Sequence, residues 1–394
     1  MTFTLTRRTL MAGLGASLVV DLRAMAQGLT LPTSPVELNI VDVAGNLQLT
    51  QRAIEAYRDA HPKLVSRINF SKAPSPELPG KIKAQQDANR LDIDGVLTGI
   101  DAIAAGAAMD MWVPIANDFA ATLPKLQDIY LDGAWAMQQQ ANGQGVCVTF
   151  CDAGPVINYM PDRVKQVPKT AEELLAWAAA NPGRFLYARP ANSGPGRIFM
   201  MGLPYLLGDK DPQDPENGWE KTWAYLQELG KYVEYYPSST GAVFKELGEG
   251  SRDMIPSQAG WDINTRALGV VPKEAAVFFL NGFHWVMDAH YLCVPRGIPQ
   301  EKLAVMVDML LYLLSPEAQA MTYDSGYFYP GPAVKDVPLS MAPADSQAIL
   351  AEFGRPEYAD IIANNPRELP LAPDRLIRAF ARWDELVGSN KVKK

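Results

Sequence analysis

The sequence predicts an α/β protein of two domains joined by several chain crossings. Its 394 residues exceed the length that one hydrophobic core usually serves. A hydrophobic content of 48% is enough to fill two such cores. Strand and helix patterns alternate in the first third of the chain, which indicates a parallel sheet covered by helices. In mid-chain, residues 145–177 have the pattern of a strand, a break, a second extended piece and a capped helix, as expected where a chain passes between domains.

The first 26 residues have the pattern of an export signal. Arg7 and Arg8 precede an apolar run, Leu10 to Val20, and small residues at Ala24 to Ala26 suit cleavage. Paired arginines favour twin-arginine export, with a Sec signal as the alternative. The apolar run is too short to span a bilayer, which needs about 20 residues. No cysteine follows the cleavage position, so we expect a soluble periplasmic protein without a lipid anchor.

The charge of the chain is acidic, with a net value of −8. Removal of the signal makes it more negative, because three arginines leave with only one aspartate. An acidic protein is not expected to bind nucleic acid or an anionic membrane.

The three cysteines are Cys147, Cys151 and Cys293. On an extended strand, at about 3.3 Å per residue, Cys147 and Cys151 are too far apart to bridge each other. A disulfide from one of them to Cys293 and three buried thiols are the two alternatives. A C-x3-C pair without a nearby histidine gives little evidence for a metal, and we expect no metal and no cofactor.

The first domain is predicted to be an open α/β sheet. The expected strands are Val36–Val43, Leu64–Phe70 and Ile93–Leu97, and the expected helices are residues 47–60, Leu78–Asn89 and Ala102–Met109. Ligands bind beyond the carboxyl ends of the strands in such sheets. Asn46, Thr98 and Asp101 follow strand ends and are therefore candidate ligand contacts, with helix capping as the alternative role.

The mid-chain crossing begins with a buried strand, Val146 to Phe150, which is rich in β-branched and aromatic residues. A turn follows at residues 152–155, and then a short extended piece, Val156 to Tyr159. A helix is predicted to begin at Thr170, because Glu173 lies at the spacing of a capping box.

The second half of the chain contains two further predicted crossings, at Met287–Val294 and at Tyr327–Pro330. Trp219 and Trp223 recur at helical spacing and are predicted to face a core. The remaining expected elements are a strand at Phe185–Ala188, a helix at Ile198–Leu207, a polar loop at residues 254–269, a strand at Val277–Leu280, a helix at Leu303–Leu314, a helix capped by Ser315 and a helical tail at 346–387.

Four segments in this order resemble the solute-binding proteins of bacterial ABC importers, extracellular family 1, which includes maltose- and polyamine-binding proteins. The segments are Tyr159–Arg163, Pro168–Leu174 (PKTAEEL), Gln258–Trp261 and Leu314–Gln319 (LSPEAQ). Each motif alone is weak, but four in order behind an export signal are specific for the superfamily.

The resemblance implies a two-lobed periplasmic-binding-protein-like fold with three crossing hinge segments. Lobe 1 would comprise residues 27–148 and 292–326, and lobe 2 residues 149–291 and 327–394. In such proteins the lobes close over a solute, and the loaded monomer docks on a membrane permease. The expected solute is a sugar or polyol, a polyamine or a small organic anion.

The segment 192–197 is the first candidate binding loop. Its glycines allow close backbone approach, the following helix offers free N–H groups, and the arginine adds a bidentate donor. The alternative is a plain strand-to-helix turn with a solvated arginine. The candidate ligand contacts are Asn192, Ser193, Gly194, Gly196 and Arg197.

The second candidate group surrounds Trp261, which combines an apolar face with polar neighbours. The alternative is a tryptophan that fills the core of the lobe. The candidates of this group are Trp261, Asp262, Asn264 and Arg266; Asp152, Tyr327 and Tyr329 lie on crossings and would line the cleft or pack between the lobes.

An enzyme is the alternative to a binding protein, because His284, Asp288, His290 and Cys293 are close in sequence. On an extended strand, however, His290 and Cys293 point to opposite faces. Iron binding through Tyr235 and Tyr236 is a further alternative, less favoured than packing. We therefore expect solute capture without catalysis, and a two-lobed periplasmic hydrolase or redox enzyme is the competing hypothesis.

Overall fold

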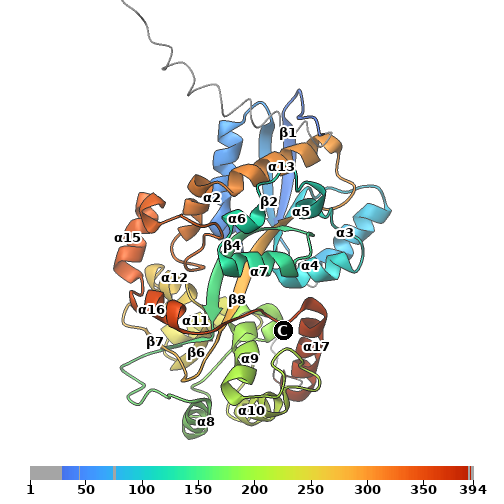
Figure 1. Ribbon diagram of the computed structural model, residues 1–394. Coiled ribbons are helices and arrows are strands. Elements are labelled where there is room, and N and C mark those ends of the chain that lie inside the picture. Colours follow the sequence, from blue (N-terminus) through green and yellow to red (C-terminus); the bar gives the residue numbers. More distant parts are fainter. Residues whose placement is uncertain (1–28, 44, 74–76, 389–390, 392–394) are drawn as a thin grey trace, which may run out of the picture.

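The computed structural model describes residues 29–43, 45–73, 77–388 and 391. The predicted export signal and its cleavage position lie outside these residues. Figure 1 shows two bodies, one above the other, that are connected by two long strands. We call the body around the larger sheet the first lobe and the body around the smaller sheet the second lobe.

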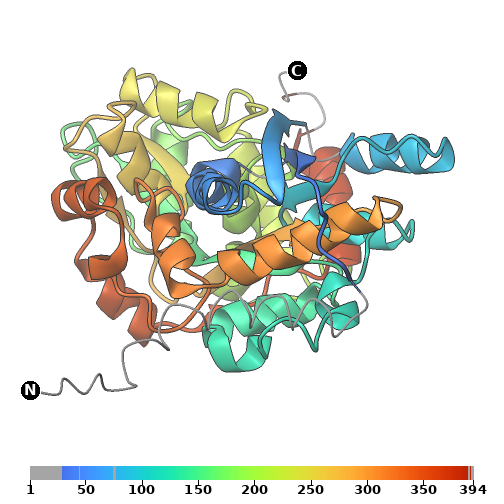
Figure 2. The same ribbon diagram turned by 90° about the horizontal axis from the view of Figure 1, so that it is seen from above.

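The first lobe is built on a sheet with the strand order β2-β1-β3-β8-β4, and β9 pairs with β8. β1 pairs in parallel with β2 and β3, as expected from the alternation of strands and helices. The elements are β1 (Val36–Asp42), α2 (Leu47–Ala60), β2 (Val65–Lys72), α3 (Leu78–Asp87), β3 (Gly95–Thr98) and α4 (Ile100–Ala107). Helix α13 (Gln300–Leu313) packs beside α2 against β1 (Figure 2).

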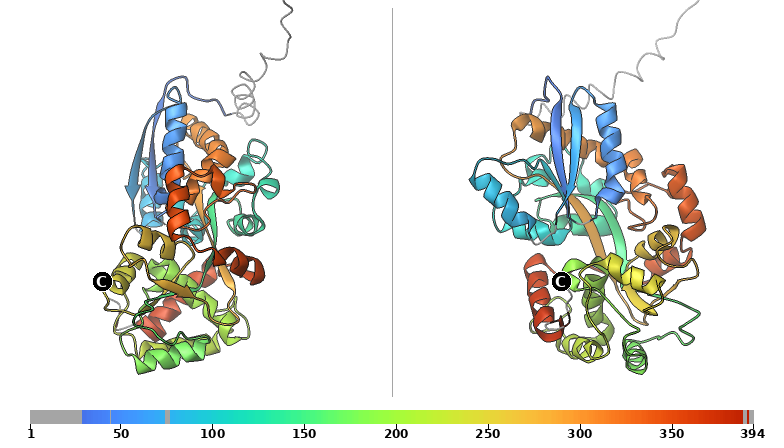
Figure 3. Two further views of the ribbon diagram at one scale, coloured as in Figure 1. Left: turned by 90° about the vertical axis from the view of Figure 1, so that its left-hand side faces the viewer. Right: turned by 180° about the vertical axis from the view of Figure 1, so that it is seen from behind.

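The two connecting strands are β4 (Val146–Gly154) and β8 (Trp285–Cys293), which pair in antiparallel fashion and are buried at every position. β4 begins in the hydrophobic core of the first lobe and ends with Cys151 and Ala153 in that of the second. The predicted crossings at these two places are confirmed (Figure 3). The third connection also passes between the cores, since Phe328 belongs to the second and Ala333 to the first, but it contains turns and no strand.

The second lobe contains a three-stranded antiparallel sheet, β6-β5-β7, surrounded by helices. Its elements are β5 (Val156–Tyr159), α8 (Ala171–Ala180), α9 (Gly194–Leu207), α10 (Glu220–Gly230), α11 (Thr240–Gly248), β6 (Met254–Ser257), α12 (Trp261–Ala267), β7 (Ala276–Phe278) and α17 (Pro373–Trp383). Trp219 and Trp223 are buried in the core, as predicted. Thr170 caps α8 by accepting from the Glu173 N–H, whereas the Glu173 carboxylate accepts from the Lys169 N–H instead of the Thr170 N–H.

Three expectations for the second lobe are wrong. Residues 185–188 form a single bridge, from Phe185 to Met254, and not a strand; their buried side chains, two of them aromatic, fill the core without a continuing backbone ladder. The polar loop expected at 254–269 is instead β6 and α12, with Gly260 at φ 108° between them. Helix α9 begins at Gly194 and not at Ile198, because Ser193 caps it and Pro195 suits its first turn.

The remaining elements are short or belong to the tail: α5 (Ile115–Asp118), α6 (Leu126–Ile129), α7 (Asp132–Gln140), α14 (Pro316–Ala320), α15 (Ala344–Phe353), α16 (Glu357–Asn364) and β9 (Arg367–Glu368). Over the described ranges no single helix is long and apolar enough to cross a membrane; α13 with residues 316–323 reaches the required length and composition only as a pair bent by 70°.

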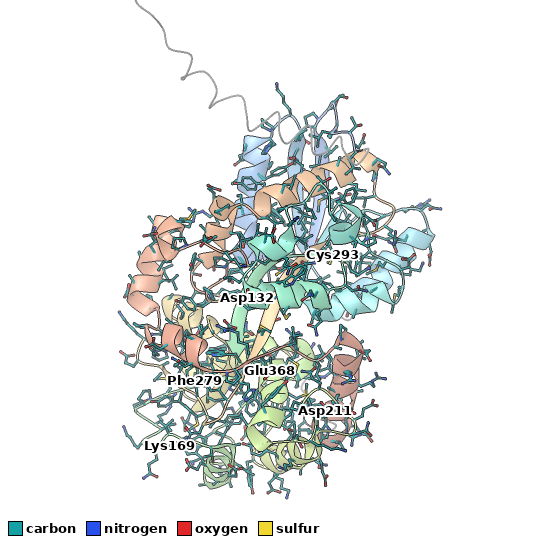
Figure 4. The ribbon with its side chains drawn as sticks, in the orientation of Figure 1. Asp132, Lys169, Asp211, Phe279, Cys293 and Glu368 are labelled. Atoms are coloured by element: carbon teal, nitrogen blue, oxygen red, sulfur yellow. The ribbon has the colours of Figure 1, made fainter. Side chains whose placement is uncertain are left out.

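All three cysteines are buried as free thiols. The alternative of three buried thiols is therefore the one that the structure supports. Cys293 lies in the first lobe, far from Lys169 and Asp211 of the second (Figure 4).

Candidate ligand-binding site

A cavity of about 360 Å³ lies where the two lobes meet. Its volume is at the lower end for small-molecule sites, which indicates a small solute. Both lobes and two of the connections contribute to it. The lining residues are Val43, Gly45, Gly99, Ala191, Asn192, Ser193, Gly194, Arg197, Ser239, Thr240, Gly241, Gln258, Trp261, Asp288, His290 and Tyr327.

Two helices of the second lobe begin at this cavity. Ser193 caps α9 by accepting from the Gly196 N–H, and Ser239 caps α11 by accepting from the Ala242 N–H. The two starts are joined, because the Ser193 and Thr240 hydroxyls lie 2.7 Å apart. The first N–H groups of a helix have no intrahelical partner and carry the positive end of its dipole. The cavity therefore has a positive wall made of backbone.

Two helices of the first lobe also begin here. Gly99 is the N-cap of α4, and Gly45 precedes α2. The start of α2 is already occupied, since the Asp42 carboxylate accepts from the N–H groups of Asn46 and Leu47. The start of α4 therefore adds a third positive helix end to those of α9 and α11.

The charged side chains of the cavity form a pair. Arg197 on α9 donates to the Asp288 carboxylate of β8 at 3.1 Å, and side-chain exposures of only 14% and 6% make this a buried ion pair. Asp288 also accepts from the Ala289 N–H. The pair ties the second lobe to a connecting strand and leaves little net side-chain charge.

An aromatic wall closes another side. Trp261 stacks on Phe244 and lies 5.0 Å, between ring centroids, from Tyr327. Burial raises the pKa of Tyr327, with a further contribution from the Asp42 and Asp288 carboxylates, so its hydroxyl stays protonated at neutral pH. Gly45 has φ +78°, and a Cβ there would lie 2.6 Å from the Tyr327 hydroxyl, so this turn requires glycine.

Gln258 supplies an acceptor. Gln258 is only 3% exposed, and its side-chain oxygen Oε1 has no hydrogen-bond partner among the described residues. This oxygen lies beside the start of α9, 2.8 Å from where a Cβ on Gly194 would be. A buried carbonyl without a donor is costly, so a ligand that donates to it would be stabilised.

Six of the residues predicted from the sequence line the cavity: Asn192, Ser193, Gly194, Arg197, Trp261 and Tyr327. The other described candidates are not part of this lining, and several of them make structural contacts. Gly196 is buried in α9, where a Cβ would lie 2.4 Å from the Ala188 carbonyl oxygen. Asn46 and Thr98 are buried, and their side chains make hydrogen bonds to Thr149 and to the Gly99 carbonyl, respectively. Asp101 lies in the first turn of α4.

The polar residues that follow Trp261 belong to a buried network away from the cavity. Asp262 accepts from Arg355 at 2.9 Å and from the Tyr358 hydroxyl at 2.8 Å. Arg266 donates to the Asp262 and Phe353 carbonyls. Asn264 donates to Ser325. This network anchors α12, so the side chains hold Trp261 in place and do not line the cavity.

Two crossing residues among the candidates also have structural contacts. Asp152 accepts from Arg367 at 2.8 Å, and burial raises its pKa although Arg367 opposes the shift. Tyr329 packs against Tyr358 with a centroid distance of 5.9 Å. Their proposed ligand contacts remain predictions.

The cavity also contains residues that the sequence analysis did not assign to ligand binding: Val43, Gly45, Gly99, Ala191, Ser239, Thr240, Gly241, Gln258, Asp288 and His290. Ser239 had a visible signal, because a serine before Thr-Gly and a periodic apolar run is typical of a helix start. Asp288 and His290 were considered only for catalysis, and Gln258 only as part of a family motif.

Of the four residues considered for catalysis, Asp288 and His290 line the cavity, whereas Cys293 and His284 do not. Cys293 pairs with Val96 in the sheet of the first lobe, and burial raises the pKa of its thiol. His284 contacts Glu368 at 2.7 Å, and His290 stacks on Phe328 with centroids 4.6 Å apart. Tyr235 donates to Glu246, while Tyr236 is packed in the core against Tyr187 and Trp383.

Comparison with known proteins gives a family. Residues 52–351 match the sequence model of a family described as "Bacterial extracellular solute-binding protein". No curated protein matches the sequence.

Solved structures share the fold. A periplasmic thiamin binding protein is similar with a TM-score of 0.63 and 13% identity, over 91% of this chain and 99% of that one. A Trichodesmium protein (IdiA, FutA) in complex with iron and citrate has a TM-score of 0.60 and 16% identity, over 90% of this chain and 100% of that one. The spermidine/putrescine ABC transporter substrate-binding protein PotD from Streptococcus pneumoniae has a TM-score of 0.57 and 12% identity, over 88% of this chain and 99% of that one. The predicted two-lobed α/β fold is thereby confirmed.

Proposed function

The chain belongs to the family of bacterial extracellular solute-binding proteins, and we propose that it captures a small polar solute between its lobes for delivery to the permease of an ABC importer. The observation that carries this proposal is the cavity itself. Helix starts of both lobes, a buried ion pair and an aromatic wall meet there in about 360 Å³.

The position of the cavity supports capture by closure. It is lined by the second lobe, by the turns after β1 and β3 of the first, and by the connections that hold Asp288 and Tyr327. A solute that contacts both lobes binds the closed form more tightly than the open form and shifts the population toward it. A permease that distinguishes the two forms would then recognise the loaded protein.

The setting of this activity follows from the sequence. We expect residues 1–26 to direct export, by the twin-arginine route or by Sec, and the mature chain to act in the periplasm. The lobe limits expected from the crossings, 27–148 with 292–326 and 149–291 with 327–394, belong to the same proposal. Candidate solutes span sugars, polyamines and organic anions; the structures that share the fold include proteins whose titles name thiamin, spermidine/putrescine and iron with citrate.

A thermal-shift screen of residues 27–394 against these solute classes tests the proposal. A solute at 100 times its Kd stabilises the folded protein by about 2.7 kcal/mol, so a bound solute raises Tm. If no solute raises Tm and the protein turns over a substrate instead, capture is the wrong function.

A variant with a blocked cavity makes the screen specific. Gly241 lines the cavity, and its Cβ position has no heavy atom within 4 Å, so Gly241→Trp would place a large ring there without a clash at Cβ. Without solute, this variant should unfold at the Tm of the parent protein, but it should lose the rise in Tm that a solute causes. Gly80→Trp, at an equally open position on α3 that is not part of the cavity lining, should retain it.

A further inference from the structure

We propose that the solute is a small organic anion that carries a hydrogen-bond donor next to its anionic group. This inference rests on the proposed function and names the ligand class of the same cavity. The positive backbone wall, the pairing of Arg197 with Asp288 and the acceptors beside them point to this class.

The positive wall favours an anion. Helices α9, α11 and α4, of 14, 9 and 8 residues, begin at the cavity. The first N–H groups of a helix point along its axis and out of its N-terminus, and each helix start favours negative charge. Ser193 and Ser239 cap one group each, and Pro195 has no N–H. The glycines Gly194, Gly241 and Gly99, however, line the cavity and have no side chain to cover the remaining groups.

The charged side chains of the cavity contribute less than its backbone to the preference for a negatively charged solute. Arg197 is paired with Asp288 at 3.1 Å. A polyamine would need unpaired carboxylates, but among the described lining residues the one carboxylate is that of Asp288, which already has this cationic partner and the Ala289 N–H. A cation would thus face three helix starts with no free charge to balance it.

The second observation is the unsatisfied Gln258 Oε1. It lies beside Gly194 at the start of α9, within the region where an anion would lie. An anion that offers only acceptors would bring its oxygens against this carbonyl and against the Asp288 carboxylate. An O–H or N–H on the ligand converts that repulsion into a hydrogen bond and satisfies the buried oxygen.

These two demands together define the class. A 2-hydroxycarboxylate and an amino acid both combine anionic oxygens with an adjacent donor, and inorganic phosphate presents the same two groups without a carbon skeleton. The carbon skeleton of such a ligand would pack on Trp261 and Tyr327. Neutral polyols lack the charge, and polyamines lack the anion.

Calorimetric titration of the mature protein with matched probes tests the class. Lactate is compared with propionate, and inorganic phosphate with sulfate, because each pair differs mainly in the donor. Spermidine and glycerol represent cations and neutral polyols. We expect at least one donor-bearing anion to bind about tenfold or more tightly than its partner, the scale of satisfying one buried acceptor that otherwise has no hydrogen bond.

Variants at Gly241 test the sign of the charge. Gly241→Asp places a carboxylate in the first turn of α11, where an acidic residue suits the helix, so the variant should fold. It should weaken anion binding about tenfold relative to the isosteric Gly241→Asn, the effect of one nearby unit charge. Gln258→Met should remove the preference for the donor-bearing member of each pair, and Gln300→Leu, at an exposed position on α13, should not.

The outcomes separate the two proposals. If spermidine or glycerol binds and the anions do not, or if Gly241→Asp strengthens binding, the anion inference is wrong while solute capture stands. If sulfate and propionate bind as tightly as their partners, the required donor is refuted. If no probe and no solute of the wider screen binds, solute capture fails, and the inference fails with it.

Discussion

The ion pair between Arg197 and Asp288 gives the sharpest quantitative prediction. Both side chains are largely buried, and their atoms lie 3.1 Å apart. Removing one partner of a buried pair leaves the other charge uncompensated, which costs about 3–5 kcal/mol. Arg197→Met should therefore lower the free energy of unfolding by roughly 3 kcal/mol. Replacing both partners by neutral side chains is often close to neutral, so Arg197→Met with Asp288→Asn should recover most of the loss.

Urea unfolding followed by far-UV circular dichroism measures these changes. The double-mutant cycle isolates the pairwise coupling, because the two residues are in direct contact. Arg52→Met is the matched control, because Arg52 pairs with Asp345 at a similar distance, 3.0 Å, but both side chains are more than half exposed. Such exposed pairs contribute little, so this variant should unfold like the parent chain.

The same variants separate stability from binding. The double variant should be nearly as stable as the parent but should bind the solute more weakly, because it lacks the Arg197 donor in the cavity. The reasoning is refuted if Arg197→Met costs less than about 1 kcal/mol, or if adding Asp288→Asn lowers stability further.

Three further changes test other parts of the structure. Thr170→Ala should destabilise the protein by about 1 kcal/mol through loss of the α8 cap, whereas Thr170→Ser should not; urea titration distinguishes them. Gly260→Ala should be strongly destabilising and lower Tm, because its φ is 108° and a Cβ would lie 2.6 Å from backbone atoms of residues 326–329, while Gly241→Ala, with open space at its Cβ, should leave Tm unchanged. The raised pKa of Asp152 means that the folded state binds more protons than the unfolded state between the ordinary carboxyl pKa and the raised one. Stability should fall as pH rises through that window, and unfolding measured from pH 4 to 7 should show a weaker dependence for Asp152→Asn.

The fold was predictable because its signals are local and strong. The alternation of β1, α2 and β2 follows hydrophobic periodicity, and the Thr170 and Ser315 caps follow residue type and spacing. Both long connections were visible as buried, β-rich segments. The errors lie where side-chain character is ambiguous: Phe185 and Tyr187 resemble a strand because they are buried and aromatic, yet they pair at only one position.

The site was predictable only in part. Ser193 and Gly194 made the glycine-rich start of α9 recognisable from the sequence. Which polar side chains point into the cavity, however, depends on packing between segments that are far apart in sequence. Asp262 and Trp261 are neighbours, yet the first is held by Arg355 and Tyr358 and the second lines the cavity. No local pattern distinguishes the two.

A crystal structure of the mature protein with its tightest-binding probe is the most direct test of solute capture in this cavity. Electron density for the solute should lie at the starts of α9 and α11, beside Gly194 and Gly241 and against Trp261. Density at another place, such as the groove of about 650 Å³ along α5 to α7, would contradict it.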